Sequence, residues 1–176
     1  MKYDRSNLPA GPMLFFWDET GAVDEGCLCQ WHHCEFEADG VRYNTAEQYM
    51  MAHKALLFGD DFVFRAILDT DEPDQQKALG RMVSGFVPEV WEANKYAIVR
   101  DGNLAKFSQN PDLREYLLGT GDAVLVEASP DDDIWGIGLD AEDPRAGDPT
   151  QWQGENLLGF ALMEVRDLLR EVGKAR

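Results

Sequence analysis

The stretch that decides how this chain is organised reads Asp122-Ala-Val-Leu-Val-Glu-Ala-Ser-Pro-Asp-Asp-Asp-Ile-Trp-Gly-Ile-Gly138. It holds two short apolar runs, residues 123–126 and 134–137, separated by an acidic segment that ends in three aspartates. This order of apolar run, polar segment and apolar run predicts two short strands joined by a loop. Two interpretations of the polar residues stay open. They form either a hairpin with a solvated acidic tip, or a sugar and nucleobase site in which carboxylates and glycines flank the ring of Trp135.

The bulk composition predicts one soluble globular domain. A chain of 176 residues with 44% hydrophobic residues is long enough to bury a core of its own. No apolar run approaches the length of a membrane span, and the first eleven residues lack the charged-then-apolar layout of a signal peptide. We therefore expect a cytoplasmic protein that does not bind membranes.

The formal net charge of −17 limits the partners of the chain. Non-specific binding to nucleic acid is not expected, because contact with the phosphate backbone would cost repulsion instead of releasing counterions. A small anionic ligand is still compatible with this charge. Any cation close to a site then matters more than it would in a neutral protein.

Three cysteines lie close together with two histidines, as Cys27, Cys29, His32, His33 and Cys34. Such a cluster raises the question of zinc, but structural zinc sites pair Cys-x2-4-Cys with a second pair further along the chain. The spacing favours reduced cysteines in a cytosolic protein, and we expect neither a metal nor a cofactor.

Local signals predict most of the remaining elements. Thr45-Ala-Glu-Gln48 fits a capping box with Thr45 as the cap, and the helix that it begins ends near Gly59. Strands are expected over residues 13–17, 28–36 and 41–43, with a hairpin turn at Asp39-Gly40, and helices over residues 62–68, 73–83, 88–107, 111–118 and 154–172. This order of strands, helices, strands and a final helix indicates an α+β fold, not an alternating parallel sheet.

Glu47 and Lys54 stand out on the first of these helices. Seven residues apart, they lie about 20° from perfect alignment and roughly 10 Å apart along the axis, so they share one face. At that distance they do not form a salt bridge. They are either two solvated charges, or a carboxylate and an ammonium that contact two ends of one ligand.

Several kinds of catalytic site find no support in the sequence. Gly136-Ile-Gly138 lacks the third glycine of a dinucleotide-binding loop, and no serine lies in a nucleophile elbow. The residues that remain are carboxylates, tryptophans and cations, namely Glu47, Glu127, Asp131, Asp132, Asp133, Trp91, Trp135, Trp152, Lys54, Arg81, Lys95 and Lys106. Cleavage of a glycosidic bond uses this kind of set. A carboxylate stabilises the oxocarbenium-like transition state and orients water, a ring stacks on the base, and a cation holds phosphate.

A series of motifs in fixed order resembles the YbiA-like, or NADAR, family over about residues 13–170. The motifs are Thr45-Ala-Glu-Gln-Tyr-Met50, Lys54-Ala55, Phe58-Gly-Asp60, Leu79-Gly-Arg81, Trp91, Ala105-Lys-Phe107, Gln109-Asn110, Leu117-Leu-Gly-Thr-Gly-Asp122, Leu125-Val-Glu-Ala-Ser129, Asp133-Ile-Trp-Gly-Ile-Gly138, Trp152-Gln-Gly-Glu-Asn156 and Leu158-Gly159. The resemblance implies an α+β fold, a predominantly helical single domain over residues 1–176 with a small antiparallel sheet.

The resemblance also implies an enzyme, an N-glycoside hydrolase. The expected reaction is hydrolysis of the N-glycosidic bond of phosphoribosylated compounds such as early riboflavin-biosynthesis intermediates, which releases ribose 5-phosphate from an aminopyrimidine. One alternative is an ADP-ribosyl hydrolase that removes ADP-ribose from modified guanine in nucleic acid. A second alternative is a non-catalytic module that binds ADP-ribose or another nucleotide.

By the same resemblance, Glu47 and Asp133 are the candidate catalytic carboxylates. One orients water or stabilises the cationic sugar and the other assists, and the sequence leaves open which residue has which role. Lys54 is a candidate phosphate ligand, and Trp91 and Trp135 are walls that face the base or the sugar. No metal is implied at this site. If residues 134–137 form a strand, Asp133 and Trp135 point the same way.

Further expectations concern the residues around this site. Gly136 and Gly138 are expected to clear space for the ligand, while Asp131 and Asp132 are expected to be solvated neighbours without contacts of their own. Relatives commonly carry serine where this chain has Cys29, so the hydroxyl of that motif is replaced by a thiol here.

Overall fold

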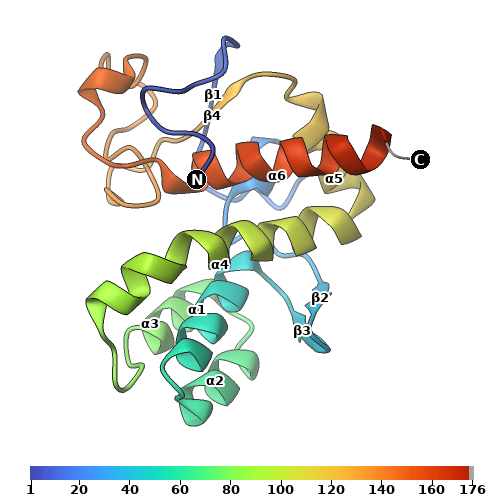
Figure 1. Ribbon diagram of the computed structural model, residues 1–176, viewed down its shortest axis with the longest axis vertical. Coiled ribbons are helices and arrows are strands. Elements are labelled where there is room, and N and C mark those ends of the chain that lie inside the picture. The colour runs from blue at the N-terminus through green and yellow to red at the C-terminus, as the bar shows by residue number, and fades with distance from the viewer. Residues whose placement is uncertain (175–176) are drawn as a thin grey trace. The chain divides into compact units, whose positions relative to one another are not determined.

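The computed structural model describes residues 1–174 of the chain (Figure 1). Its elements in chain order are β1 (Met13–Phe16), the 3-10 helix η1 (Glu25–Leu28), β2 (Phe36–Ala38), β3 (Val41–Tyr43), α1 (Ala46–Leu57), α2 (Asp61–Leu68), α3 (Pro73–Gly80), α4 (Pro88–Gln109), α5 (Pro111–Gly119), β4 (Val124–Glu127), the 3-10 helix η2 (Pro149–Gln151) and α6 (Leu157–Lys174). The predicted α+β class, predominantly helical with a small antiparallel sheet, is confirmed. Among the described residues, no helix is long and apolar enough to cross a lipid bilayer.

Contacts between residues group the chain into two compact units. The first unit consists of Met1–Cys29 and Pro111–Arg176, of which residues up to 174 are described, and the second is Gln30–Asn110. Each unit has its own buried apolar residues and is described by itself below. The single domain expected over residues 1–176 stays a prediction.

The first unit is built on a parallel pair of strands, β1 and β4. Met13 pairs with Val124 and Phe16 with Glu127, and all four residues of β4 are buried. Burial on both faces is typical of parallel strands, and α6 packs against β4 (Figure 1). The predicted pairing of residues 123–126 with 134–137 is therefore wrong. Residues 134–137 form no strand, because their carbonyls accept hydrogen bonds from residues 153–158, and within the described residues only the N–H of Ile137 donates to β4, at the carbonyl of Glu127.

The carboxamide of Asn156 pairs with the edge of β4 that does not face β1. Its Nδ2 donates to the carbonyl of Leu125 at 3.0 Å, and its Oδ1 accepts from the backbone N–H of Glu127 at 3.0 Å. Asn156 is fully buried and has a φ of 58°, in the left-handed region. Gly159 lets α6 come this close, since a Cβ there would lie 2.1 Å from the carbonyl oxygen of Leu125.

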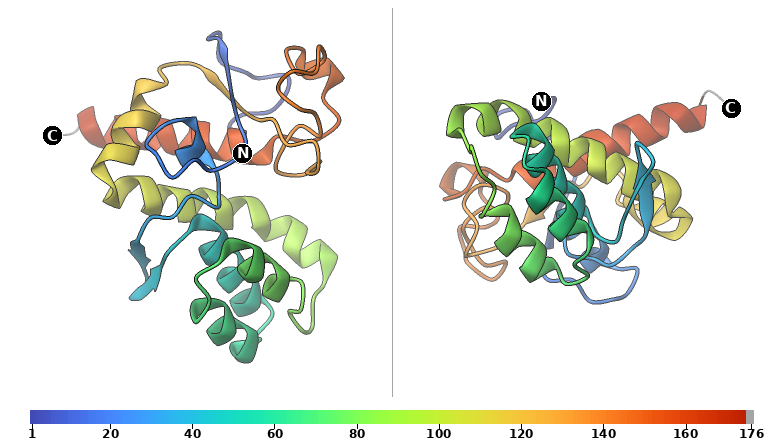
Figure 2. Two further views of the ribbon diagram at one scale, coloured as in Figure 1. Left: turned by 180° about the vertical axis from the view of Figure 1, so that it is seen from behind. Right: turned by 90° about the horizontal axis from the view of Figure 1, so that it is seen from below.

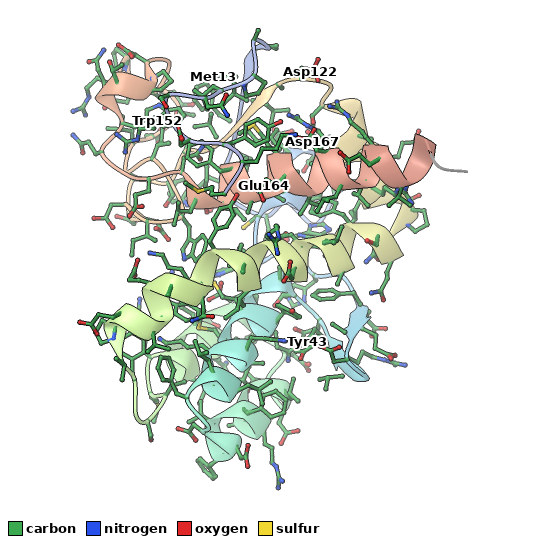
Figure 3. All side chains as sticks on the ribbon, in the orientation of Figure 1. Met13, Tyr43, Asp122, Trp152, Glu164 and Asp167 are labelled. Carbon is green, nitrogen blue, oxygen red and sulfur yellow. The ribbon has the colours of Figure 1, made fainter. Side chains whose placement is uncertain are left out.

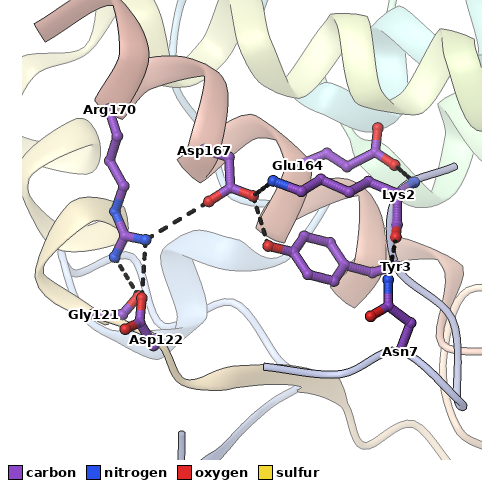
Figure 4. A network of polar contacts seen from close by, with 8 residues as sticks. All are labelled: Lys2, Tyr3, Asn7, Gly121, Asp122, Glu164, Asp167 and Arg170. Carbon is purple, nitrogen blue, oxygen red and sulfur yellow. Dashed lines mark hydrogen bonds and ion pairs between the residues drawn. The ribbon is translucent and has the colours of Figure 1, made fainter. Parts of the chain in front are cut away.

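The chain start is bound to α6 by polar side chains (Figure 4). Asp167 accepts hydrogen bonds from the Lys2 ammonium and the Tyr3 hydroxyl, both at 2.6 Å, and the backbone N–H of Lys2 donates to Glu164. Burial and the bond to Asp167 raise the pKa of Tyr3. Residues 2–7 therefore form part of the first unit.

In the second unit, α1 packs against α2, α3 and α4, and α1 to α3 lie side by side in Figures 1 and 2. Every residue from Ala46 to Ala52 is buried. Two glycines make the close packing possible. A Cβ at Gly80 would lie 1.9 Å from the sulfur of Met51, and one at Gly102 would lie 2.4 Å from the ring of Tyr49.

The predicted cap of α1 is confirmed with one change in detail. Thr45 Oγ1 accepts from the backbone N–H of Gln48 at 2.9 Å, as a capping residue does. The side chain of Gln48 reaches back to the N–H of Asn44 at 2.8 Å, one residue before the cap. Its Nε2 donates to the carbonyl of Ile67 at 3.0 Å, so the same side chain also fastens α1 to the end of α2.

The hairpin of β2 and β3 turns at Asp39 and Gly40, as predicted. Their φ values of 52° and 76° are those that a tight two-residue hairpin turn requires. The strand expected over residues 28–36 is wrong over most of its length. Residues 25–28 are a 3-10 helix, and the strand begins only at Phe36, because the intervening residues have no neighbouring strand to pair with.

We predict that Asn156→Ala lowers the free energy of unfolding by about 3 kcal/mol, because it leaves two buried backbone groups of β4 without partners. Denaturant titration followed by circular dichroism measures this. Asn156→Asp keeps the acceptor for the N–H of Glu127 and loses the donor to the carbonyl of Leu125, so it breaks one of the two hydrogen bonds. A change below about 0.5 kcal/mol in Asn156→Ala would contradict the role given to the carboxamide.

A second prediction concerns the aromatic cluster beside α1, where Tyr43 and Tyr49 meet edge to face with ring centroids 5.0 Å apart. Burial raises the pKa of both hydroxyls from 10.0 to about 12. Since the folded state keeps these protons when the unfolded state has lost them, stability should fall as the pH rises from about 10 to 12.

Thermal melts between pH 9 and 12 test this, and absorbance of the phenolate reports the two pKa values. The Tyr43→Phe and Tyr49→Phe double variant should lose less stability over this range than the unsubstituted protein. Equal losses in the two proteins would show that other groups are responsible.

Candidate functional site

Glu47 lies in the first turn of α1 and is 3% exposed. Its backbone N–H donates to the carbonyl of Gln30 at 3.0 Å, which fixes the start of the helix against the preceding segment. The N-terminus of a helix carries a partial positive charge that favours a carboxylate there. The interpretation of Glu47 as a solvated charge is therefore excluded, and this carboxylate sits in a low-dielectric environment.

Lys54 lies two turns further along α1 and is half-buried. Its ammonium is 4.6 Å from the ring centroid of Phe86 and 5.4 Å from that of Trp91, within the range of cation–π contacts. Burial and the nearby Arg81 guanidinium lower the pKa of Lys54, while the Glu47 carboxylate opposes that shift. The second unit thus brings the predicted residues Glu47, Lys54 and Trp91 into one neighbourhood.

The first unit carries the other three predicted residues on an irregular segment after β4. Asp133 is exposed, and its backbone carbonyl accepts from the N–H of Glu155 at 2.9 Å. Trp135 is partly exposed, and its carbonyl accepts from Leu158 at 3.1 Å. Because this segment is not a strand, the expectation that Asp133 and Trp135 share a strand face does not apply. Their predicted roles, and the joint action of Glu47 and Asp133, stay predictions.

Asp132 has a structural role that the sequence analysis did not assign to it. Its Oδ1 accepts from the backbone N–H groups of Ile134 at 2.9 Å and Trp135 at 2.7 Å, and its carbonyl accepts from Gly138. Aspartate side chains often stabilise turns by accepting hydrogen bonds from backbone N–H groups two or three residues later. The expectation that Asp132 makes no contacts is wrong.

Gly136 is required by the packing of the same segment. A Cβ there would lie 2.9 Å from the carbonyl oxygens of both Asp132 and Glu127. Its own carbonyl accepts from the N–H of Asn156 at 2.9 Å. The protein backbone thus uses the space that this glycine leaves, and a ligand contact at Gly136 stays a prediction.

Two other residues considered in the sequence, Trp152 and Lys95, are buried and make contacts within the protein. Trp152 is buried, and its Nε1 donates to the carbonyl of Ala146 at 2.7 Å (Figure 3). Lys95 is buried and forms an ion pair of 2.6 Å with Glu92. Among the described residues, no group of three or more His, Cys, Asp or Glu side chains is arranged to hold a metal ion.

Two buried amides near Glu47 escaped the sequence analysis. Gln30 and Asn103 are 6% and 0% exposed, and Asn103 Nδ2 donates to Gln30 Oε1 at 2.8 Å. A signal for Asn103 was present. It lies four residues after Val99 and four before Phe107, both buried, so a polar side chain interrupts an apolar helical stripe.

The chain was compared with known proteins. The model of the NADAR domain matches residues 15–170. An N-glycosidase of Acanthamoeba polyphaga mimivirus is 52% identical over 127 residues, which are 72% of this chain and 75% of the relative. The N-glycosidase YbiA of Escherichia coli is 33% identical over 133 residues, 76% of this chain and 74% of that protein. An N-glycosidase of Nostoc punctiforme is 32% identical over 147 residues, 84% of this chain and 87% of the relative.

A solved structure agrees with these sequence relationships. The NMR structure of the E. coli protein YbiA has a TM-score of 0.77 and 28% identity, and the match covers 94% of this chain and 89% of that one. The chain belongs to the NADAR family. It is an enzyme of the N-glycosidase class, as its named relatives are, and the predicted family resemblance is confirmed.

Proposed function

We propose that the chain hydrolyses the N-glycosidic bond of phosphoribosylated compounds, such as early riboflavin-biosynthesis intermediates. The products would be a free aminopyrimidine and ribose 5-phosphate. The observation that carries this proposal is a buried carboxylate and a half-buried ammonium on one helix, Glu47 and Lys54, with an aromatic ring beside the ammonium. This pairing suits a ligand with a developing positive charge at one end and a phosphate at the other.

The two carboxylates differ in exposure, and this supports a division of roles. Glu47 is buried, so its charge acts in a low dielectric where it stabilises an oxocarbenium-like sugar more strongly than it would in water. Asp133 is exposed and has access to water, so it would orient the attacking water and accept its proton. The bond from the anomeric carbon to nitrogen breaks, its electron pair leaves with the base, and water adds to the anomeric carbon. The proton that Asp133 takes from this water is returned through solvent to the departing nitrogen, which gives the neutral free base.

The phosphate would be held by Lys54. Its contacts with Phe86 and Trp91 restrict the side chain before a ligand arrives. Burial and the Arg81 guanidinium lower the pKa of Lys54, and a bound phosphate would oppose that shift. Cys27, Cys29 and Cys34 form no disulfide bond among the described residues, which is consistent with action in the reducing cytoplasm, and we include this compartment in the proposal.

One observation favours a second candidate substrate. The Arg81 guanidinium at the end of α3 contributes to the lowered pKa of Lys54, so a second cation lies within electrostatic range of the Lys54 ammonium. Two cations could hold a diphosphate, as in the ADP-ribose of a modified guanine. Release of free base from a panel of phosphoribosyl and ADP-ribosyl compounds discriminates the two substrates. Tight binding without any product would instead indicate a nucleotide-binding module.

The carboxylate assignment predicts that Glu47→Gln and Asp133→Asn each lower kcat by on the order of a hundredfold or more on a phosphoribosylated aminopyrimidine. Liquid chromatography of the released base measures the rate. Asp131→Asn is the matched control, because it removes an exposed carboxylate two residues from Asp133 and should keep full activity. Unchanged turnover in both Glu47→Gln and Asp133→Asn would refute the assignment.

The phosphate assignment predicts that Lys54→Met raises KM for the phosphorylated substrate about tenfold, because a charge-assisted hydrogen bond is lost. KM for the riboside without phosphate should not change. Arg65→Met, which removes an exposed cation from α2, controls for the change in net charge. A rise in KM of equal size for both substrates would mean that Lys54 does not recognise phosphate.

A further inference from the structure

Two side chains of the second unit are joined through only half of their hydrogen-bonding groups. Asn103 Nδ2 donates to Gln30 Oε1 at 2.8 Å and to the carbonyl of Val99 at 2.9 Å. Gln30 Nε2 and Asn103 Oδ1 are buried and make no hydrogen bond within the described residues. The pair therefore presents one unused donor, Gln30 Nε2, and one unused acceptor, Asn103 Oδ1.

The other buried glutamines of the unit behave differently. Gln48 accepts from the N–H of Asn44 and donates to the carbonyls of Ile67 and Thr70. Gln76 accepts from the hydroxyl of Thr45 at 2.7 Å and donates to the carbonyl of Thr70 at 2.7 Å. Because buried amides are normally paired, the unused groups of Gln30 and Asn103 need a partner that comes from outside the fold.

The position of the pair connects it to the proposed chemistry. The carbonyl of Gln30 accepts from the backbone N–H of Glu47 at 3.0 Å, so Gln30 is bonded directly to the residue proposed to face the anomeric carbon. Asn103 lies in the middle of α4, which packs against α1. Gln30 thus contacts the start of α1 directly, and Asn103 lies on a helix that packs against α1.

The chemistry of the unused groups selects the ligand group. A ribose carries neighbouring hydroxyls, and a hydroxyl can accept from an amide N–H and donate to an amide oxygen. A phosphate would match the donor but not the acceptor, and an apolar group would match neither. A vicinal diol is therefore the part of an N-riboside that fits both.

We propose that Gln30 and Asn103 bind the ribosyl hydroxyls of the substrate, with Gln30 Nε2 as donor and Asn103 Oδ1 as acceptor. The inference rests on the proposed N-riboside substrate and adds the residues that distinguish ribose from deoxyribose. It also explains why two buried amides are kept with incomplete bonding. Their desolvation lowers the stability of the free protein and is recovered when the sugar binds.

The test measures binding of ribose 5-phosphate and 2-deoxyribose 5-phosphate by calorimetry, with thermal melts as a check of folding. The unsubstituted protein should prefer the ribose compound by on the order of tenfold. Gln30→Met should abolish this preference, because it removes the unpaired donor, and it should lower Tm less than the control below, because it breaks only the bond from Asn103 Nδ2. Gln30→Glu keeps the acceptor for Asn103 and loses the donor, and it should abolish the preference as well.

Gln76→Met is the matched control. It removes a buried glutamine whose groups are all paired, so it should lower Tm and leave the preference for ribose intact. A preference that survives in both Gln30 variants, or its absence from the unsubstituted protein, would overturn the inference. Binding of the sugar phosphate does not require turnover, so failure here is distinguishable from failure of the proposed hydrolysis.

Discussion

The burial of the first two turns of α1 is the constraint on which the second unit depends. Residues Ala46 to Ala52 are covered by neighbouring helices, and this coverage requires glycine at two contact points, Gly80 and Gly102. It also forces Glu47 into a low-dielectric environment, where a carboxylate is retained only with compensating interactions. The helix N-terminus and the nearby cation of Lys54 both act in that direction. Packing and electrostatics of the proposed site are therefore consequences of the same helix.

In the first unit, Asn156 has a comparable role. Its carboxamide completes the edge of β4, and its backbone N–H binds the carbonyl of Gly136. One residue thus joins a buried strand to the irregular segment that carries Asp133 and Trp135. That segment has no regular secondary structure, so its shape depends on hydrogen bonds such as these and on the turn formed by Asp132.

Stability and function make opposite demands on the buried polar groups of this protein. Gln48 and Gln76 are fully bonded and hold helices together, while Gln30 and Asn103 are incompletely bonded beside Glu47. A fold selected for stability alone would pair or remove the second set. The incomplete bonding of Gln30 and Asn103 supports the proposed contact with a ligand without reference to any relative.

The sequence by itself determined the elements whose signals are local. The cap at Thr45, the turn at Asp39-Gly40 and the prolines that begin α3 and α4 act through neighbouring residues, so they could be predicted closely. Local pattern also placed Glu47 and Lys54 on one helix face.

Only the tertiary structure decided the features that depend on residues far apart in the chain. Strand β4 pairs with β1, more than a hundred residues earlier, and residues 134–137 bond to the segment before α6. An apolar run has the same appearance whether its partner is near or distant, so a hairpin was expected where a parallel pair forms. The burial of Glu47, Gln30 and Asn103 was equally hidden, because a polar residue becomes buried through what packs over it and not through its own sequence neighbours.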